Sequence, residues 1–200
     1  MRTLTLDDLL AGWEGVNVRG AAAVPVTGLA YDSRRVRPGF IFFALPGQVV
    51  DGHAYVEEAI GRGAVAVVVE REIRARRDVA VIRVADSRRA LARLASLFFR
   101  EPTRRLTTIG VTGTNGKTST TFMIRSLLGE VGPAPGLIGT VQYMIGERLL
   151  PAFRTTPESL DLQEMFDQVA QAGVPAVVFE VSSHALVQHR VDGVCFDVGV

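Results

Sequence analysis

The residue types best suited to chemistry lie in one short run, GTNGKT at positions 113–118. An apolar, β-branched segment at 106–112 precedes the run and predicts a buried strand, and a helical pattern starts at Lys117. Glycine takes a positive φ without a Cβ clash, so Gly113 and Gly116 allow a tight turn between strand and helix. This turn directs unpaired N–H groups and the positive end of the helix dipole at one point, which predicts a phosphate site.

Two side chains of this run have specific uses at a phosphate site. The Lys117 ammonium group can reach the β- and γ-phosphates of a nucleotide, and the Thr118 hydroxyl can bind Mg²⁺. Lys117 is the only lysine among the 22 lysines and arginines, and a compact ammonium group fits between phosphates better than a planar guanidinium. Val111 occupies the first glycine position of the general P-loop pattern. The alternative interpretation is therefore a tight strand–helix turn with a chance GKT.

Two further polar clusters occur in the second half of the sequence. Thr155 and Thr156 precede a predicted helix, and Glu180 closes an apolar strand just before the run SSH at 182–184. Strands that alternate with helices predict a mostly parallel sheet, whose ligands bind at the carboxyl ends of the strands. We therefore expect the P-loop, the two threonines and the Glu180 cluster to meet at one edge of the sheet.

The role of the Glu180 cluster is open from local sequence. A carboxylate at the end of an apolar strand is costly unless it meets a cation, which beside a nucleotide is Mg²⁺. An ordinary salt bridge or an N-cap role is the alternative. His184 is open as a catalytic residue, a metal ligand or a structural histidine, with the last favoured. No G-x-S-x-G pattern surrounds Ser182 and Ser183, so both are interpreted as hydrogen-bond donors rather than nucleophiles.

The composition excludes several classes of protein. Hydrophobic residues make up 48% of the chain and charged residues 22%, which is typical of a globular protein. The net charge of +1 argues against a nucleic-acid partner. The single Cys195 excludes an internal disulfide and fits a reducing compartment. With no signal peptide and no apolar run near the roughly 20 residues of a membrane span, we expect a cytoplasmic protein without membrane insertion.

Residues 1–102 have the pattern of a small α/β unit that ends at Pro102. Polar loops at 32–34 and 47–53 are interpreted as turns from their Asp, Ser and Gly content. Strands are predicted to end near Tyr31 and to span 40–45, 64–69 and 79–84, and helices to span 4–10 with Thr5 as cap, 54–60, and 87–99 with Asp86 as cap.

Residues 103–200 form the second predicted unit, which opens with the P-loop strand and helix. The helix is expected to end at Gly129 and to bury Phe122, Ile124, Leu127 and Leu128. Also predicted are a strand at 137–144, a hairpin turn at Gly146, a helix with Pro157 first and Glu158 near its positive end, and strands at 176–181 and 194–200. Because the sequence stops in an apolar strand, we expect it to be the first part of a longer protein.

Four segments together resemble the Mur ligase family, and most closely its MurE type, the UDP-N-acetylmuramoyl-tripeptide synthetases. They are DSR at 32–34 with the following PGFIFFALPG and DGHAY, GVTGTNGKTSTT at 110–121, TTPES at 155–159, and EVSSHALVQHRV at 180–191. The resemblance covers essentially the whole chain. It implies an α/β fold with a small N-terminal UDP-binding domain (1–102), followed by the first part (103–200) of a P-loop, mostly parallel-sheet ATP-binding domain.

The resemblance also implies roles for individual residues. Lys117 is the implied catalytic residue, and Thr118 and Glu180 are the implied Mg²⁺ ligands. ATP is expected to contact Gly113, Thr114, Asn115, Gly116, Lys117, Thr118 and Ser119. The UDP-MurNAc-peptide is expected to contact Tyr31, Ser33, Gln48, Val49 and Val50 with its uridine part, and Thr155, Thr156, Ser182, Gln188 and Arg190 with its muramoyl peptide.

The implied reaction adds a diamino acid to UDP-MurNAc-L-Ala-D-Glu through an acyl phosphate, with ATP and Mg²⁺, in peptidoglycan precursor synthesis. Diaminopimelate, lysine and ornithine are all open, because the family's amino-acid-binding domain and its carbamylated lysine would lie beyond Val200. A monomer is expected. The alternatives are a MurF-type ligase, a P-loop nucleotide-binding module without synthetase activity, and a non-catalytic UDP-sugar binder.

Overall fold

The computed structural model describes residues 4–13, 16–21, 23–47, 50–73 and 78–200. The chain divides into two compact units, 1–94 and 95–200. Both are α/β units built on a largely parallel sheet, as the sequence predicts. The division falls inside helix α3 (Ser87–Phe98).

The first unit contains a five-stranded sheet of order β1-β5-β4-β3-β2. Strands β2 to β5 are parallel, and β1 pairs antiparallel with β5. Every residue of β4 is buried, which explains its continuous apolar sequence. The strands are β1 (Asn17–Arg19), β2 (Gly28–Ala30), β3 (Phe40–Phe43), β4 (Ala66–Val69) and β5 (Ala80–Arg83).

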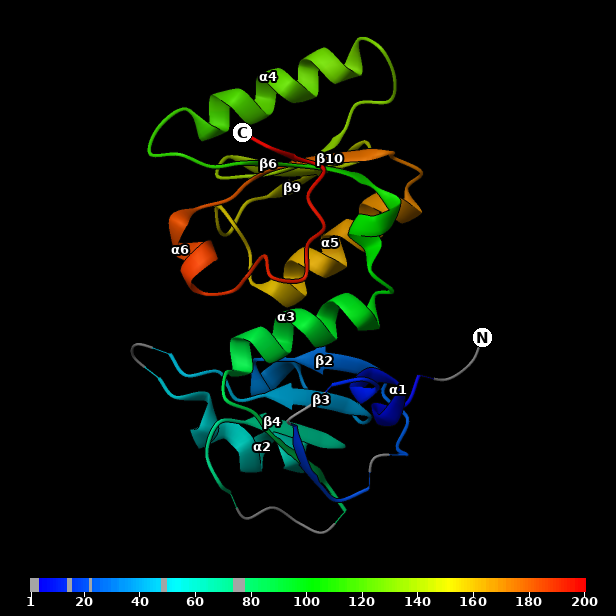
Figure 1. The fold of residues 1–200 in the computed structure, drawn as a ribbon, viewed down its shortest axis with the longest axis vertical. Coiled ribbons are helices and arrows are strands. Elements are labelled where there is room, and N and C mark those ends of the chain that lie inside the picture. The colour runs from blue at the N-terminus through cyan, green and yellow to red at the C-terminus, as the bar shows by residue number, and fades with distance from the viewer. Residues whose placement is uncertain (1–3, 14–15, 22, 48–49, 74–77) are drawn as a thin grey trace. The chain divides into compact units, whose positions relative to one another are not determined.

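Two helices of the first unit, α1 and α3, begin at the predicted caps. Thr5 forms a capping box with Asp8, and Asp86 Oδ1 accepts the N–H groups of Arg88 and Arg89 at the start of α3. Figure 1 shows α2 and α3 on opposite faces of the sheet. The predicted helix at 54–60 is instead a 3₁₀ helix, η2, followed by α2. The elements are α1 (Leu6–Leu10), η1 (Ser33–Arg35), η2 (Gly52–Tyr55) and α2 (Val56–Gly61).

The second unit contains a six-stranded sheet of order β11-β6-β10-β7-β8-β9. The first four strands in this order are parallel. β8 and β9 form an antiparallel hairpin with Gly146 at φ 59°, which confirms the predicted turn. The strands are β6 (Thr107–Val111), β7 (Gly136–Ile138), β8 (Gln142–Ile145), β9 (Arg148–Pro151), β10 (Ala176–Glu180) and β11 (Val198–Gly199).

Helices cover both faces of this second sheet (Figure 1). On one face, Phe122 and Leu128 of α4 pack against a buried cluster that includes Val178. On the other face, Phe166 of α5 packs against Phe179. The helices are η3 (Pro102–Arg105), α4 (Lys117–Gly129), α5 (Ser159–Gln171) and α6 (Ser183–Val187). None of the helices in the described part of the chain is long and apolar enough to cross a membrane.

Two predicted details of the helices are wrong. Leu127 is 69% exposed, because at about 100° per residue it lies roughly 100° from Leu128 and roughly 140° from Phe122, outside the face that packs against the sheet. Pro157 is not the first residue of α5, because the extended Glu158 (ψ 155°) is the N-cap and its carboxylate accepts the Ser159 N–H.

Two predicted strands differ from the structure as well. The segment 137–144 is not one strand but two, β7 and β8, joined by a bend at 139–141. A Cβ at Gly139 would lie 2.4 Å from Glu180 Oε1, so the chain turns here around the glutamate. The strand predicted at 194–200 is only Val198–Gly199, because Phe196 and Asp197 approach β6 through a bend.

Candidate functional site

The three predicted polar clusters of the second unit line one cleft of about 350 Å³. β6 and β10 are neighbours with Val111 opposite Glu180, so both strands end at the same edge of the sheet. This confirms the predicted convergence, since the carboxyl ends of parallel strands place the residues that follow them together. The cleft is lined by Thr114, Asn115, Gly116, Lys117, Thr118, Ser119, Thr140, Thr155, Glu180 and Ser182.

The P-loop has the backbone geometry that its glycines predict. Gly113 has φ 138° and Gly116 has φ 82°. Gly116 is the N-cap of α4 and supplies no side chain to cap the helix, so the first N–H groups of α4 remain suited to an anion. Lys117 Nζ donates to the carbonyl of Gly113 at 2.7 Å and lies 3.5 Å from the carbonyl of Thr114. The lysine therefore lies along the loop that would hold the phosphates.

Glu180 is 1% exposed and accepts hydrogen bonds on both carboxylate oxygens. Oε1 accepts from the Thr118 hydroxyl at 2.9 Å and from the Thr140 N–H at 2.9 Å. Oε2 accepts from the Thr140 hydroxyl at 3.1 Å. Among the described residues Glu180 forms no ion pair, so neutral donors stabilise this buried charge.

Thr118 and Glu180 fit a hard divalent cation at this position. Their oxygens, one hydroxyl and one carboxylate, are 2.9 Å apart and border the phosphate loop. The described residues contain no group of three or more His, Cys, Asp or Glu that could hold a metal. Mg²⁺ bound by one carboxylate commonly completes its coordination with phosphate oxygens and water, which matches this sparse donor set.

The two predicted threonines face different surroundings. Thr155 lines the cleft, and its hydroxyl lies 3.0 Å from that of Thr140. Thr156 is 1% exposed; its hydroxyl donates to the carbonyl of Glu180 at 2.8 Å and accepts from the Ser182 N–H at 3.0 Å. Thr156 therefore fastens the turn to the end of β10, and Thr155 presents a side chain to the cleft.

The segment after β10 is a short helix rather than a row of donors. Ser182 is the N-cap of α6, and its hydroxyl accepts from the Ala185 N–H at 3.2 Å, an acceptor role in addition to the predicted donor role. His184 is exposed and does not line the cleft; its Nε2 lies 3.0 Å from Gln188 Nε2. This surface position favours neither a catalytic nor a metal-binding role for His184.

Arg190 is a buried link within the second unit. The residue is 8% exposed and donates to the carbonyl of Thr156 at 2.8 Å and to Gln188 Oε1 at 2.6 Å. Its Nε lies 3.7 Å from Glu158. Neither Gln188 nor Arg190 lines the cleft, so the structure does not bring these two predicted substrate contacts together with Thr155 and Ser182 there.

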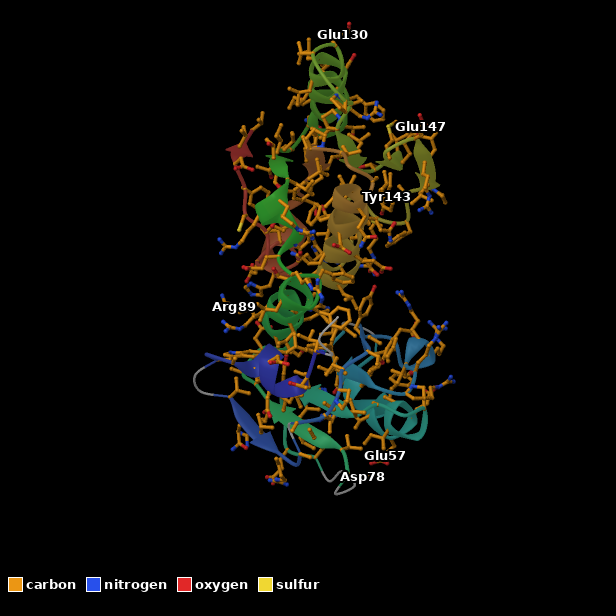
Figure 2. The ribbon with its side chains drawn as sticks, turned by 90° about the vertical axis from the view of Figure 1, so that its right-hand side faces the viewer. Glu57, Asp78, Arg89, Glu130, Tyr143 and Glu147 are labelled. Carbon is orange, nitrogen blue, oxygen red and sulfur yellow. The ribbon has the colours of Figure 1, made fainter. Side chains whose placement is uncertain are left out.

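Tyr143 supports the turn before Thr155, a role that the sequence did not indicate. Its side chain is 1% exposed, and Figure 2 marks its place in the second unit. The hydroxyl donates to the carbonyl of Arg154 at 2.6 Å and accepts from the N–H groups of Arg154 at 3.0 Å and Phe153 at 3.3 Å. One side chain thus fixes the backbone directly before the predicted substrate residues.

Replacing Tyr143 with phenylalanine is expected to lower the free energy of unfolding by about 1–3 kcal/mol, because buried backbone groups lose their partner. Burial raises the pKa of Tyr143 above its ordinary 10.0, and hydrogen bonds from the backbone partly oppose this. The raised pKa of Tyr143 stabilises the folded protein fully below the unfolded-state pKa. This stabilisation is lost as the pH rises through the folded-state pKa. Urea titrations of both proteins measure the change, with the exposed Tyr55→Phe as the control. Equal stability of Tyr143→Phe and the parent would contradict it.

Three of the predicted uridine contacts, Tyr31, Ser33 and Val50, lie in the segments that follow β2 and β3, which are neighbouring parallel strands. Tyr31 directly follows β2. Ser33 is 5% exposed, and its hydroxyl donates to Glu58 Oε2 at 2.9 Å. Val50 is 50% exposed in the loop after β3. Gln48 and Val49 lie outside the described residues.

His53 and Asp51 close the base of that loop. The His53 side chain is 4% exposed; its Nε2 accepts from the Glu70 N–H at 3.0 Å, and its Nδ1 lies 2.6 Å from Asp51 Oδ1. The Nδ1 atom therefore carries the proton that Asp51 accepts. The His53 backbone N–H is the largest cause that lowers the pKa of Asp51. Asp51 thus caps the 3₁₀ helix η2 through the His53 N–H, which agrees with the predicted turn chemistry, and His53 also binds the backbone of Glu70.

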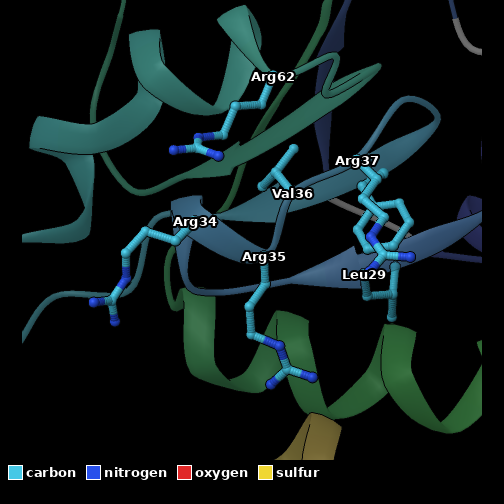
Figure 3. A pocket seen from close by; sticks show the side chains of 7 residues that line it. Leu29, Arg34, Arg35, Val36, Arg37 and Arg62 are labelled. Atoms are coloured by element: carbon cyan, nitrogen blue, oxygen red, sulfur yellow. The ribbon is translucent and has the colours of Figure 1, made fainter.

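A separate hollow of about 490 Å³ lies in the first unit. Its lining residues, within the part of the chain that the structure describes, include four arginines and no carboxylate. Figure 3 labels these arginines around the hollow. Arg34 is paired with Asp32 and Arg62 with Glu58. Tyr31, Ser33 and Val50, the predicted uridine contacts that the structure describes, do not line it. The lining residues are Leu29, Arg34, Arg35, Val36, Arg37, Phe40 and Arg62.

Comparisons with known proteins agree with both units. Residues 25–99 match the model of the Mur ligase family catalytic domain, and residues 111–200 match that of the Mur ligase middle domain. A protein from Geobacillus kaustophilus named UDP-N-acetylmuramoyl-L-alanyl-D-glutamate--2,6-diaminopimelate ligase is 50% identical over 200 residues, which is 100% of this chain and 40% of the relative. A protein of the same name from Caldanaerobacter subterraneus is 49% identical, over 98% of this chain and 41% of the relative.

Solved structures give the same picture. A structure titled UDP-N-acetylmuramoyl-L-alanyl-D-glutamate--2,6-diaminopimelate ligase has a TM-score of 0.79 and 25% identity, covering 99% of this chain and 40% of that one. MurF from Acinetobacter baumannii has a TM-score of 0.62 and 26% identity, covering 92% of this chain and 36% of that one. The chain thus spans about two fifths of the length of these relatives. With two models of one family on successive parts of the chain, and a phosphate loop, a buried glutamate and a threonine turn in one cleft, the chain belongs to the Mur ligase family.

Proposed function

We propose that the whole protein is an ATP-dependent ligase that joins a diamino acid to UDP-MurNAc-L-Ala-D-Glu in the synthesis of peptidoglycan precursors. The observation that carries this proposal is the single cleft that the phosphate loop lines together with Glu180, Thr155 and Ser182. A nucleotide phosphate and an acceptor substrate bound in that cleft would lie side by side. The names of the relatives favour 2,6-diaminopimelate as the amino acid.

The proposed chemistry needs no nucleophilic side chain. A carboxylate oxygen of the UDP-linked dipeptide attacks the γ-phosphorus of ATP, the bond to ADP breaks, and an acyl phosphate forms. The amine of the diamino acid then attacks the acyl carbon; the carbon–oxygen bond to phosphate breaks, the nitrogen loses a proton, and an amide results. Positioning and charge neutralisation are the tasks left to the protein.

The residues of the cleft are suited to those tasks. Lys117 and the N-terminus of α4 offset the negative charge that gathers when a carboxylate approaches a triphosphate. Mg²⁺ held by Thr118 and Glu180 would add positive charge at the same phosphates. Residues 113–119 bind ATP in this proposal. Thr155 and Ser182 contact the muramoyl peptide, while Thr156, Gln188 and Arg190 hold the surrounding segments in place.

The remaining parts of the proposal concern the first unit and the whole protein. Residues 1–102 form the UDP-binding domain, and residues 103–200 begin the ATP-binding domain. Tyr31, Ser33 and the loop at 48–50 contact the uridine part, since Tyr31, Ser33 and Val50 follow neighbouring strands. The protein acts as a cytoplasmic monomer without a nucleic-acid partner.

Phosphate release by the full-length protein tests the proposed function. We expect release from ATP that requires both UDP-MurNAc-L-Ala-D-Glu and diaminopimelate, with one phosphate for each amide formed. Replacing diaminopimelate with lysine or ornithine tests the choice of amino acid. Phosphate release that ignores the muramoyl dipeptide would overturn the proposal.

A MurF-type ligase is the second candidate, because MurF structures also match this chain. The higher TM-score of the diaminopimelate ligase, 0.79 against 0.62, favours the first candidate. The same assay separates them: a MurF-type enzyme would release phosphate with the UDP-linked tripeptide and D-alanyl-D-alanine but not with the dipeptide and diaminopimelate.

A further inference from the structure

Thr140 lies in the bend between β7 and β8 and touches both sides of the cleft. Its N–H donates to Glu180 Oε1 at 2.9 Å, and its hydroxyl donates to Glu180 Oε2 at 3.1 Å. The same hydroxyl lies 3.0 Å from the Thr155 hydroxyl. Thr140 is therefore the residue that joins the glutamate beside the phosphate loop to the threonine on the acceptor side.

The directions of these hydrogen bonds follow from the number of protons. An ionised carboxylate only accepts, so the single hydroxyl proton of Thr140 goes to Glu180. The contact between the two threonines then needs the proton of Thr155, which donates to the Thr140 oxygen. With its proton used in this way, Thr155 offers only lone pairs to the cleft. A ligand group that Thr155 binds must be an N–H or O–H donor.

The local backbone is built around this arrangement. A Cβ at position 139 would lie 2.4 Å from Glu180 Oε1, so only glycine lets the bend approach the carboxylate closely enough for the Thr140 N–H to reach it. Glu180 is itself 1% exposed at the end of β10, and the Thr156 hydroxyl donates to its backbone carbonyl. The glutamate therefore has little freedom to move away from Thr140.

We propose that Thr140 is a positioning residue that holds Glu180 and Thr155 in one hydrogen-bonded unit and makes Thr155 a hydrogen-bond acceptor for the UDP-linked substrate. The substrate part of this inference rests on the proposed function. The part that concerns Glu180 does not, because it follows from contacts within the chain.

The test compares Thr140→Val with Thr140→Ser in the full-length protein. Valine keeps the shape and the backbone N–H but removes the hydroxyl, while serine restores the hydroxyl. Calorimetry would measure the affinity for ATP with Mg²⁺, for ATP with EDTA, and for UDP-MurNAc-L-Ala-D-Glu alone. Mg²⁺ is expected to raise the ATP affinity of the parent protein over its value in EDTA. In Thr140→Val we expect this gain to be about tenfold smaller, the scale for the loss of a hydrogen bond to a charged group. ATP affinity in EDTA should stay unchanged.

The affinity of Thr140→Val for the dipeptide should fall about fivefold, which is the scale of one neutral hydrogen bond. The reason is that the Thr155 hydroxyl no longer has a partner that fixes its orientation. Thr140→Ser should restore both affinities. Unchanged Mg²⁺ dependence in the valine variant would overturn the proposal, and so would equal losses with Mg²⁺ and EDTA that serine does not restore. If the parent protein itself fails to bind the dipeptide, the proposed function fails, and the Mg²⁺ dependence still decides the role of Thr140.

Discussion

Lys117→Ala is expected to abolish ATP-dependent phosphate release by the full-length protein, with a loss of at least about a hundredfold in turnover, the scale for removing a group that stabilises transition-state charge. Lys117 is the only lysine in the chain, and its Nζ lies 2.7 Å from the Gly113 carbonyl along the phosphate loop. No other cationic side chain lines the cleft, within the part of the chain that the structure describes. The loss should appear in turnover rather than in binding of the UDP-linked dipeptide.

Lys117→Arg provides the matched comparison, because it keeps the charge and changes the shape. The lysine contacts two carbonyls of a tight loop, Gly113 and Thr114, where a planar guanidinium is bulkier. We expect the turnover of Lys117→Arg to be at least about tenfold below that of the parent, because the shape of the cation matters as well as its charge. Steady-state phosphate release measures turnover, and calorimetry measures the binding of UDP-MurNAc-L-Ala-D-Glu, so the two effects of each variant are separated. Loss of dipeptide binding in Lys117→Ala would contradict a separate uridine-binding domain at 1–102.

Glu180→Gln is expected to have the second largest effect, on the dependence of ATP binding on Mg²⁺. The change keeps the size of a side chain that is 1% exposed but removes the charge that faces the Thr118 hydroxyl. The amide nitrogen also cannot accept from the Thr140 N–H or hydroxyl. We expect about a hundredfold loss of turnover and a higher Mg²⁺ concentration for half-maximal activity.

A titration of phosphate release against Mg²⁺ concentration measures the Glu180→Gln effect. Glu147→Gln is the control, because Glu147 is an exposed glutamate of the β8–β9 hairpin, labelled in Figure 2. It should behave as the parent protein. An unchanged Mg²⁺ requirement in Glu180→Gln would exclude this glutamate as a ligand. Thermal unfolding of the variant separates a local loss of the cation site from a loss of the fold.

The sequence alone predicted the two α/β units, the phosphate loop and the edge of the sheet at which the site lies. Each strand of the second unit that carries a site residue is marked by a β-branched apolar run, and glycines at 113 and 116 left little choice of turn. Caps such as Thr5 and Asp86 follow from a side-chain bond to nearby N–H groups, which depends only on neighbours in sequence. These features are local, so they can be predicted without the fold.

Only the tertiary structure decided which polar residues face the cleft. Thr155 and Thr156 are equivalent in sequence, but pairing with the end of β10 buries the second and leaves the first in the cleft. The family resemblance implied a substrate contact for Arg190, but its guanidinium donates to Thr156 and Gln188 inside the unit. Both outcomes depend on residues distant in the chain.

Thr140 shows why the remainder of the site could not be predicted. Its sequence neighbours indicated a continuous strand at 137–144, because the apolar residues on either side dominate the pattern. The bend exists because the Glu180 carboxylate, 40 residues further along the chain, requires hydrogen-bond donors at that point. The sequence by itself determined the phosphate loop and the edge of the sheet where it lies. Only the packing of separate segments around a buried charge decided which side chains complete the site.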